Sequence, residues 1–118
     1  MRTITSHQAP GLNEKLTITV LDTTGAGGAP HHYHIRGDFP DGWDIHFQKG
    51  PVQEAGINGT SNEALLAIVR DRLECFQLGP YACEENDTAL EGVLAAMAAL
   101  HRRTKKRIER GVEGTSTP

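Results

Sequence analysis

The chain has 118 residues, of which 37% are hydrophobic and 23% charged, with a formal net charge of −3. This length predicts one compact unit with a thin core, and thin-cored domains often gain stability by oligomerising. Residues 101–110 carry six Lys or Arg against one Glu, so the other 108 residues carry a net charge of −8. This balance argues against general nucleic-acid binding but leaves one segment that could hold an anion.

We expect a protein of the cytoplasm without a membrane span. No run of about 18 apolar residues is present, and the first residues lack the apolar stretch of a signal peptide. Cys75 and Cys83 lie on or beside predicted helices, without CxxC spacing, which favours reduced thiols over a disulfide or a zinc site.

The first half of the chain predicts a flexible arm and a small sheet. Residues 1–14 form the arm, and residues 15–59 form an antiparallel β-meander. Alternating polar and apolar residues predict strands over Lys15–Asp22, His31–Arg36 and Trp43–Gln48. The intervening segments are rich in Gly and Pro, as hairpin turns are. The connector Gly50–Gly59 leaves room for a short fourth strand.

The second half, residues 60–118, predicts a helical hairpin with a C-terminal tail. Thr60 and Glu63 form a capping box for a first helix that ends at Gly79. A tight turn then leads into an antiparallel second helix, Tyr81–Arg110, with Pro80 in its first turn and Gly111 as its stop. The fold class is therefore α+β.

The second helix is too long for its partner to cover. About 30 residues rise roughly 45 Å, whereas the first helix of about 17 residues rises roughly 25 Å. The uncovered face carries Met97, Leu100, Thr104 and Ile108. A second copy of the chain would bury this face, so we expect a homo-oligomer, a dimer or larger.

Two motifs in the strand region resemble functional sites: a glycine-rich phosphate-binding loop and a histidine cluster that could bind a metal or transfer protons. The loop Gly25–Gly28 resembles a phosphate cradle, but no Lys follows it and the next element is a strand, so a hairpin turn is favoured. His31, His32, His34 and His46 fall on neighbouring strands and could reach a zinc ion or act as acid–base groups. No cysteine or carboxylate stands at ligand spacing, so we expect no metal, no cofactor and an ordinary polar sheet face.

Two segments could bind an anion. Asn58, Thr60 and Asn62 surround a helix N-terminus, where free N–H groups attract anions, although capping alone explains them. The stronger candidate is the end of the long helix, where residues 103, 106, 107 and 110 share one face. Helix-dipole relief explains part of this charge, so a solvated face and an anion site both stay open. The candidate ligands there are Arg102, Arg103, Lys106, Arg107 and Arg110, with Gly111 and Thr115 of a tail that folds over the anion.

Several runs resemble a family of small proteins of tailed phages and prophages: Ile18–Asp22 with Gly25–Ala29, Phe47–Pro51, Glu54–Gly59, Asn62–Leu66, Gly79–Cys83 and Arg110–Thr115. Members have carried the label "ABC transporter ATPase", which the missing P-loop lysine contradicts here. By architecture the chain is more distantly similar to phage anti-defence sponges, which sequester nucleotide signals of Thoeris or cyclic-oligonucleotide (CBASS) immunity.

This resemblance implies a non-enzymatic phage protein in the host cytoplasm that binds a cyclic or ADP-ribose-type nucleotide signal as a homo-oligomer. The alternatives are a phage enzyme that cleaves such a nucleotide with its strand histidines, and a protein-interaction module that inhibits a host factor.

Overall fold

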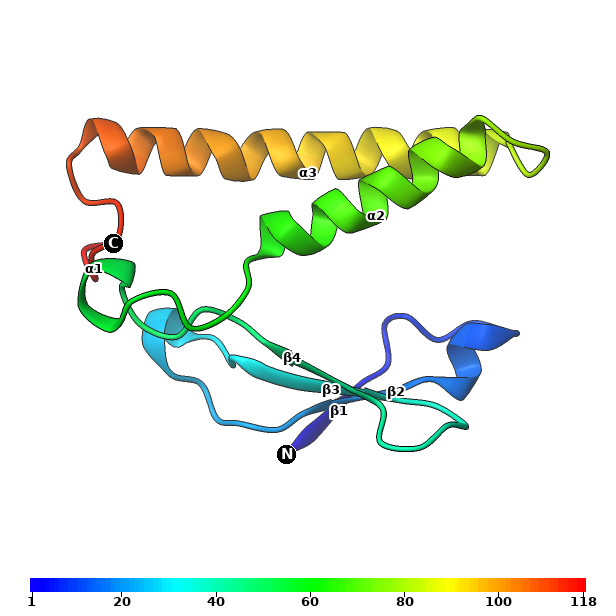
Figure 1. The fold of residues 1–118 in the computed structure, drawn as a ribbon, viewed down its shortest axis with the longest axis horizontal. Coiled ribbons are helices and arrows are strands. Elements are labelled where there is room, and N and C mark those ends of the chain that lie inside the picture. Colours follow the sequence, from blue (N-terminus) through cyan, green and yellow to red (C-terminus); the bar gives the residue numbers. More distant parts are fainter. The chain divides into compact units, whose positions relative to one another are not determined.

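A computed structural model describes residues 1–118, which form two compact units. The first comprises residues 1–60 with residue 118, and the second comprises residues 61–117. A four-stranded antiparallel sheet lies in the first unit and the two long helices lie in the second (Figure 1), which confirms the predicted α+β class. That the chain forms a single compact unit stays a prediction.

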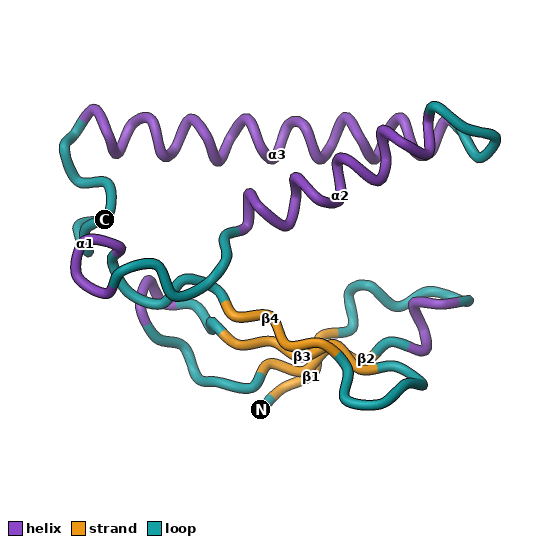
Figure 2. The backbone as a smooth tube through the Cα atoms, viewed as in Figure 1, coloured by secondary structure: helices purple, strands orange, loops and turns teal.

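The sheet of the first unit is a simple meander in which each strand pairs with the next along the chain (Figure 2). All three pairings are antiparallel. Two short 3-10 helices, Leu12–Lys15 and Ala26–Gly28, interrupt the connections. The strands are β1 (Arg2–Ile4), β2 (Thr17–Val20), β3 (His32–Arg36) and β4 (Trp43–His46).

Strand β1 lies in the segment that the sequence predicted as a flexible arm. Arg2 pairs opposite Val20, and Ile4 pairs opposite Ile18. A strand of three residues has no periodicity to detect, so only its partner strand reveals it. The predicted meander was correct in its order, but it lacked this edge strand.

The connector after β4 holds a short helix in place of the fourth strand for which the sequence left room. Helix α1 spans Val52–Ala55 and begins after Pro51, whose fixed φ suits a helix start. It ends at Gly56, which has a φ of +70° and accommodates a conformation that side chains disfavour. Phe47 leaves β4 and forms an isolated parallel bridge with Thr60, so the strand is shorter than predicted.

The core of the first unit is small, as the composition predicted. Val20 is 1% exposed, and the only other buried residue of the chain is His31, at 8%. The rings of Tyr33 and Phe47 meet edge to face with their centroids 5.5 Å apart. A sheet with so little buried apolar surface relies on its polar contacts to hold the loops in place.

The second unit is a helical hairpin of α2 (Asn62–Gln77) and α3 (Glu84–Glu109) (Figure 1). Ser61 caps α2, because its side chain accepts a hydrogen bond from the backbone N–H of Ala64 at 3.1 Å. The predicted capping box at Thr60 was therefore wrong. The Thr60 backbone is occupied instead, since its N–H donates to the carbonyl of His46 at 2.8 Å.

Helix α3 begins three residues later than predicted because a side chain holds the preceding backbone extended. The amide of Gln77 donates to the carbonyl of Cys83 at 2.9 Å and accepts from its N–H at 3.1 Å. Cys83 has a φ of −156°, which is incompatible with a helix. At the other end, Gly111 with a φ of +72° terminates the helix as the sequence predicted.

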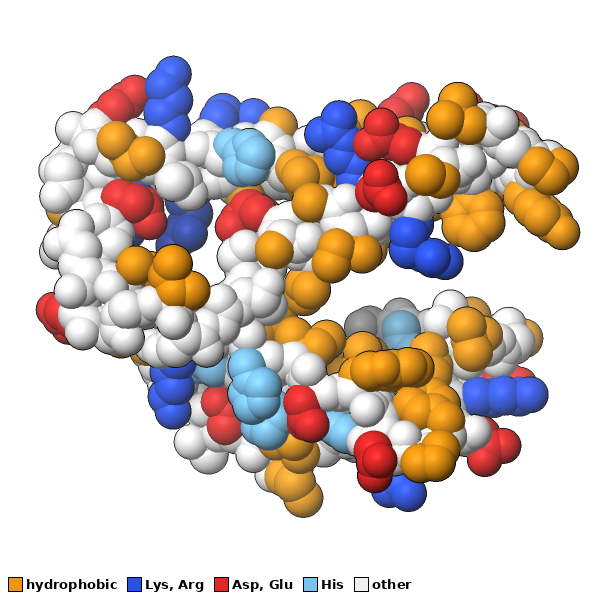
Figure 3. All heavy atoms as spheres, viewed as in Figure 1, with side chains coloured by type: hydrophobic (Ala, Val, Ile, Leu, Met, Phe, Trp, Pro, Cys, Tyr) orange, Lys and Arg blue, Asp and Glu red, His pale blue; other side chains and the backbone are white.

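No residue of either long helix is fully buried. The 26 residues of α3 rise about 39 Å, and the 16 residues of α2 rise about 24 Å. Ile68 on α2 is 59% exposed and Ile108 on α3 is 61% exposed. Apolar side chains therefore lie open along the hairpin (Figure 3). None of the helices combines the length and the apolar character that crossing a bilayer requires.

Candidate functional site

The basic end of α3 divides into two groups of cations. The side chains of Arg102, Arg103, Lys105 and Lys106 are exposed and make no hydrogen bond or ion pair with the protein. Arg107 is only 14% exposed in its side chain. Lys and Arg side chains gather over the C-terminal part of α3 in Figure 3. The predicted basic face therefore has two parts. Arg103 and Lys106 point outward and are accessible, whereas the side chain of Arg107 is largely covered.

Arg107 holds the C-terminal tail against the helix. Its Nη1 donates to the carbonyl of Thr117 at 2.7 Å, and its Nη2 donates to the carbonyls of Val112 at 2.9 Å and Thr115 at 3.2 Å. Its Nε also pairs with a carboxylate oxygen of Glu113 at 3.2 Å. The guanidinium thus gathers four tail acceptors around one cation.

The tail folds as a cap on the end of α3. The N–H of Gly111 donates to the carbonyl of Ile108 at 3.0 Å, and the N–H of Val112 donates to the carbonyl of Arg107 at 3.0 Å. The hydroxyl of Thr115 closes the turn by donating to the carbonyl of Val112. Gly111 and Thr115 were predicted to fold over a bound anion, and in the structure this segment folds around Arg107. Arg110 is the C-cap residue of the helix.

The second predicted anion segment has a structural role in the loop after β4. The side-chain amide of Asn58 donates to the carbonyl of Lys49 at 2.7 Å and accepts from its N–H at 2.8 Å. Asn58 and Thr60 belong to the first compact unit, whereas Asn62 is the first residue of α2 in the second unit. The polar groups of Asn58 are thus committed to its own loop.

Asp22 is a site residue that the sequence analysis did not identify. Its carboxylate accepts hydrogen bonds from the N–H groups of His31, at 2.9 and 3.1 Å, and of His32, at 3.0 Å. These backbone bonds, that of His31 foremost, lower the pKa of Asp22 below its ordinary value. The carboxylate fixes the start of β3. Only the fold reveals the pairing, because nine residues separate Asp22 from its first partner.

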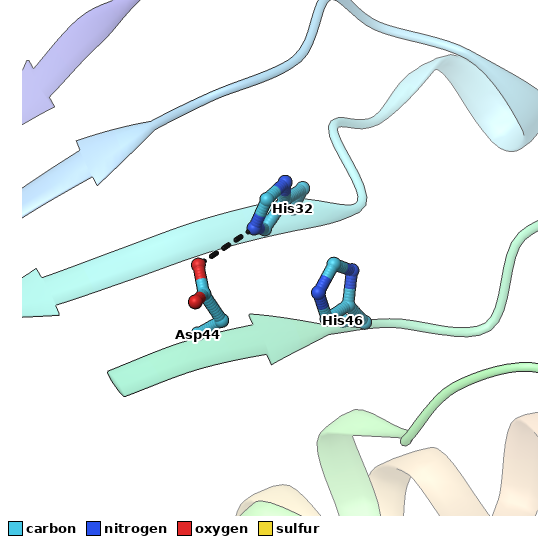
Figure 4. Close-up of side chains that lie close together, drawn as sticks. All are labelled: His32, Asp44 and His46. Atoms are coloured by element: carbon cyan, nitrogen blue, oxygen red, sulfur yellow. Dashed lines mark hydrogen bonds and ion pairs between the residues drawn. The ribbon is translucent and has the colours of Figure 1, made fainter. Parts of the chain in front are cut away.

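Three histidines of β3 and β4 gather around one carboxylate, and Figure 4 shows two of them, His32 and His46. The Nε2 of His32 lies 2.8 Å from the Oδ1 of Asp44, and the Nδ1 of His34 lies 3.1 Å from the same oxygen. The rings of His32 and His46 stack with their centroids 4.1 Å apart. The hydrogen bonds from His32 and then His34 lower the pKa of Asp44. The sequence pattern indicated the group of histidines but did not indicate this carboxylate as their partner.

A cavity of about 350 Å³ adjoins this cluster within the first unit. Its walls include His32 and His46 from the cluster, with Asp22, Lys49 and Asn58. His31 also lines it, and the Nδ1 of that buried ring has no hydrogen-bond partner. The pocket combines cationic, carboxylate, amide and imidazole groups.

A family model described as "Acb2/Tad1, hairpin domain" matches residues 42–105, more than half of the chain. The chain belongs to the Acb2/Tad1 hairpin family. The match includes β4, all of α2 and most of α3, with Arg102 and Arg103. It ends before Lys106 and the tail, and it begins after His32 and His34.

A named relative of this Acb2/Tad1 hairpin protein is Thoeris anti-defense 1 from Bacillus phage SBSphiJ7. The two are 46% identical over 71 residues, which make up 60% of this chain and 50% of the relative. The chain therefore spans about half the length of the curated relative that it matches. The more distant likeness to phage anti-defence proteins, which rested on architecture and not on a motif, is supported by both comparisons.

Proposed function

We propose that this chain is a phage anti-defence protein that binds and sequesters a nucleotide immune signal in the host cytoplasm without turning it over. The observation that carries the proposal is the 46% identity to a phage protein named for defence against Thoeris immunity. Membership of the Acb2/Tad1 hairpin family supports it. The expected ligand is a cyclic or ADP-ribose-type nucleotide.

The outward cations of α3 are the proposed grip on the phosphates of the signal. Arg103 and Lys106 are one turn apart on an exposed helix face and have no partner within the chain. Arg102 lies beside them, and Arg110 follows at the end of the same face. Arginine suits this role because its planar fork binds phosphate oxygens in pairs. Arg107 contributes by holding the tail in place.

The binding form is proposed to be a homo-oligomer. The hairpin exposes Ile68, Phe76, Leu94 and Ile108, and neither long helix has a buried residue. A second copy that packs on this hairpin would bury these side chains. Light scattering at micromolar concentration should then report a dimer or larger. Ile108→Glu should dissociate it, because the substitution would bury an unpaired charge, whereas Lys105→Glu should not.

The grip is tested by titrating the protein with a cyclic dinucleotide and with a cyclic ADP-ribose isomer. A charge-assisted hydrogen bond contributes about 1.5–3 kcal/mol, so Arg103→Ala and Lys106→Ala should each weaken binding roughly tenfold to a hundredfold. Arg70→Ala is the matched control, since it removes an exposed helical cation that pairs only with Glu74. Unchanged affinity in both α3 variants would exclude the basic end as the binding site.

A nucleotide-cleaving enzyme is the second candidate, favoured by one observation. His32 and Asp44 form a hydrogen-bonded imidazole–carboxylate pair that could move a proton, and His32 lines the 350 Å³ cavity. Cleavage would require His32, so His32→Ala should abolish turnover if this alternative holds. Sequestration without turnover predicts that no product forms with either protein.

A further inference from the structure

The face of the β3–β4 hairpin that carries the histidines has the pattern of a metal site. His32 pairs opposite His46, and His34 pairs opposite Asp44. The four residues alternate along their strands, so their side chains project from one face. Three of them meet closely: one donor atom from each of His32, Asp44 and His46 lies within 4.8 Å of the others.

We propose that His32, Asp44 and His46 form a binding site for a divalent transition-metal ion, with zinc as the favoured occupant. Zinc binds imidazole nitrogen and carboxylate oxygen at about 2.0–2.2 Å, so the donor atoms of a tetrahedral site lie about 3.4 Å apart. The three donor atoms already lie within 4.8 Å of one another, and the side chains are exposed or half-buried, so small side-chain rotations would bring them to this spacing. The fourth position is left for water or a ligand.

The hydrogen bond from His32 marks where the ion would sit. Its Nε2 and the Oδ1 of Asp44 are 2.8 Å apart, and a metal ion would replace the shared proton between them (Figure 4). The ring of His46 has no hydrogen bond within the protein and stacks on His32 with an interplanar angle of 23°.

His34 supports the site from outside the ligand set. Its Nδ1 lies 3.1 Å from the carboxylate oxygen of Asp44, so it can orient that oxygen by a hydrogen bond. Metal-binding carboxylates commonly carry such a partner, and its mutation commonly lowers metal affinity. Nitrogen-rich ligands select zinc and its transition-metal neighbours over magnesium and calcium. We therefore expect that loss of His46 or of Asp44 weakens zinc binding more than loss of His34.

The proposal is independent of the nucleotide-binding function and needs no nucleotide for its test. Tag-free protein, washed with chelator and dialysed, is titrated with zinc chloride by calorimetry at pH 7.5. The proposal predicts one ion bound per chain. His46→Asn and Asp44→Asn should each weaken binding at least tenfold, and His34→Asn should weaken it less. His101→Asn, on an exposed position of α3, is the matched control and should leave zinc affinity unchanged.

A second measurement separates specific binding from a folding defect. Nitrogen chemical shifts of the imidazole rings, recorded on the intact parent protein, should move for His32 and His46 on zinc addition but stay fixed for His101. Absence of stoichiometric binding at about 0.1 mM zinc, far above the dissociation constants of zinc sites in zinc-finger peptides, would overturn the proposal. Equal zinc affinity of the parent and His46→Asn, with both proteins folded by circular dichroism, would overturn it as well.

Discussion

Replacing Arg107 by alanine should release the C-terminal tail while the helical hairpin stays folded. The guanidinium donates four hydrogen bonds to tail acceptors: the carboxylate of Glu113 and the carbonyls of Val112, Thr115 and Thr117. Alanine removes all four at once. Because none of these acceptors belongs to α2, their loss leaves the packing of the two helices untouched.

The magnitude follows from two opposing terms. Four hydrogen bonds to a charged group contribute about 6 kcal/mol at about 1.5 kcal/mol each. Ordering the backbone of residues 112–117 costs about 6 kcal/mol or more, at about 1 kcal/mol or more per residue. The two terms nearly cancel, and the backbone hydrogen bonds donated by the N–H groups of Val112 and Thr115 keep the parent tail closed by a small margin. Without Arg107 the ordering cost is no longer offset, so we expect the free energy of tail opening to become negative and the free energy of global unfolding to change by less than about 1.5 kcal/mol.

Hydrogen exchange measured by NMR reports this directly. The amides of Val112 and Thr115 donate to the carbonyls of Arg107 and Val112, so they should be protected in the parent protein and should exchange at the rate of a free peptide in Arg107→Ala. Arg103→Ala, which removes an unpartnered cation from the same helix, should leave both amides protected. Full protection in Arg107→Ala would refute the assignment of tail stability to this side chain.

Three further changes test the remaining structural claims. Val20→Ala should lower the free energy of unfolding by about 2–3 kcal/mol, from two buried methylene equivalents and a cavity term, measured by urea denaturation. Asn58→Ala should lower it by about 1–2 kcal/mol, because it removes both side-chain bonds to the Lys49 backbone; an unchanged midpoint would mean that the loop holds without them. The pKa values of Asp22 and Asp44 are lowered in the folded state, so their stabilising contribution is complete above the ordinary value of 3.8 and is lost as pH falls below it. Acid unfolding of the double variant Asp22→Asn/Asp44→Asn should accordingly show a weaker pH dependence below about pH 4 than that of the parent.

The sequence predicted the elements whose periodicity was long enough to detect. The apolar stripe of α3 and the Gly111 stop gave its end correctly, and alternation located β2, β3 and β4 to within a few residues. It missed β1, because a three-residue strand exists only through its pairing with β2. It also misplaced the start of α3, which depends on the bond between the side chain of Gln77 and the backbone of Cys83.

The sequence shows which residue types cluster in the candidate sites, but it does not show which side chains contact each other. The cluster of cations near the end of α3 was visible as charge, yet the separation of Arg107 from Arg103 depends on how the tail folds. Likewise, the histidines were visible as a group. That Asp44 would meet His32 diagonally across the hairpin follows from the register of β3 and β4, which strand patterns alone do not fix.

Capture and release of an intact nucleotide is the measurement that tests the proposed function most directly. Excess protein is incubated with a cyclic ADP-ribose isomer or a cyclic oligonucleotide, the mixture is filtered, and the retained protein is denatured by heat. Sequestration predicts that a signal is depleted from the filtrate and returns chemically unchanged after heating, as judged by mass spectrometry. Recovery of a hydrolysed product, or no depletion of either class of nucleotide by excess protein, would contradict it.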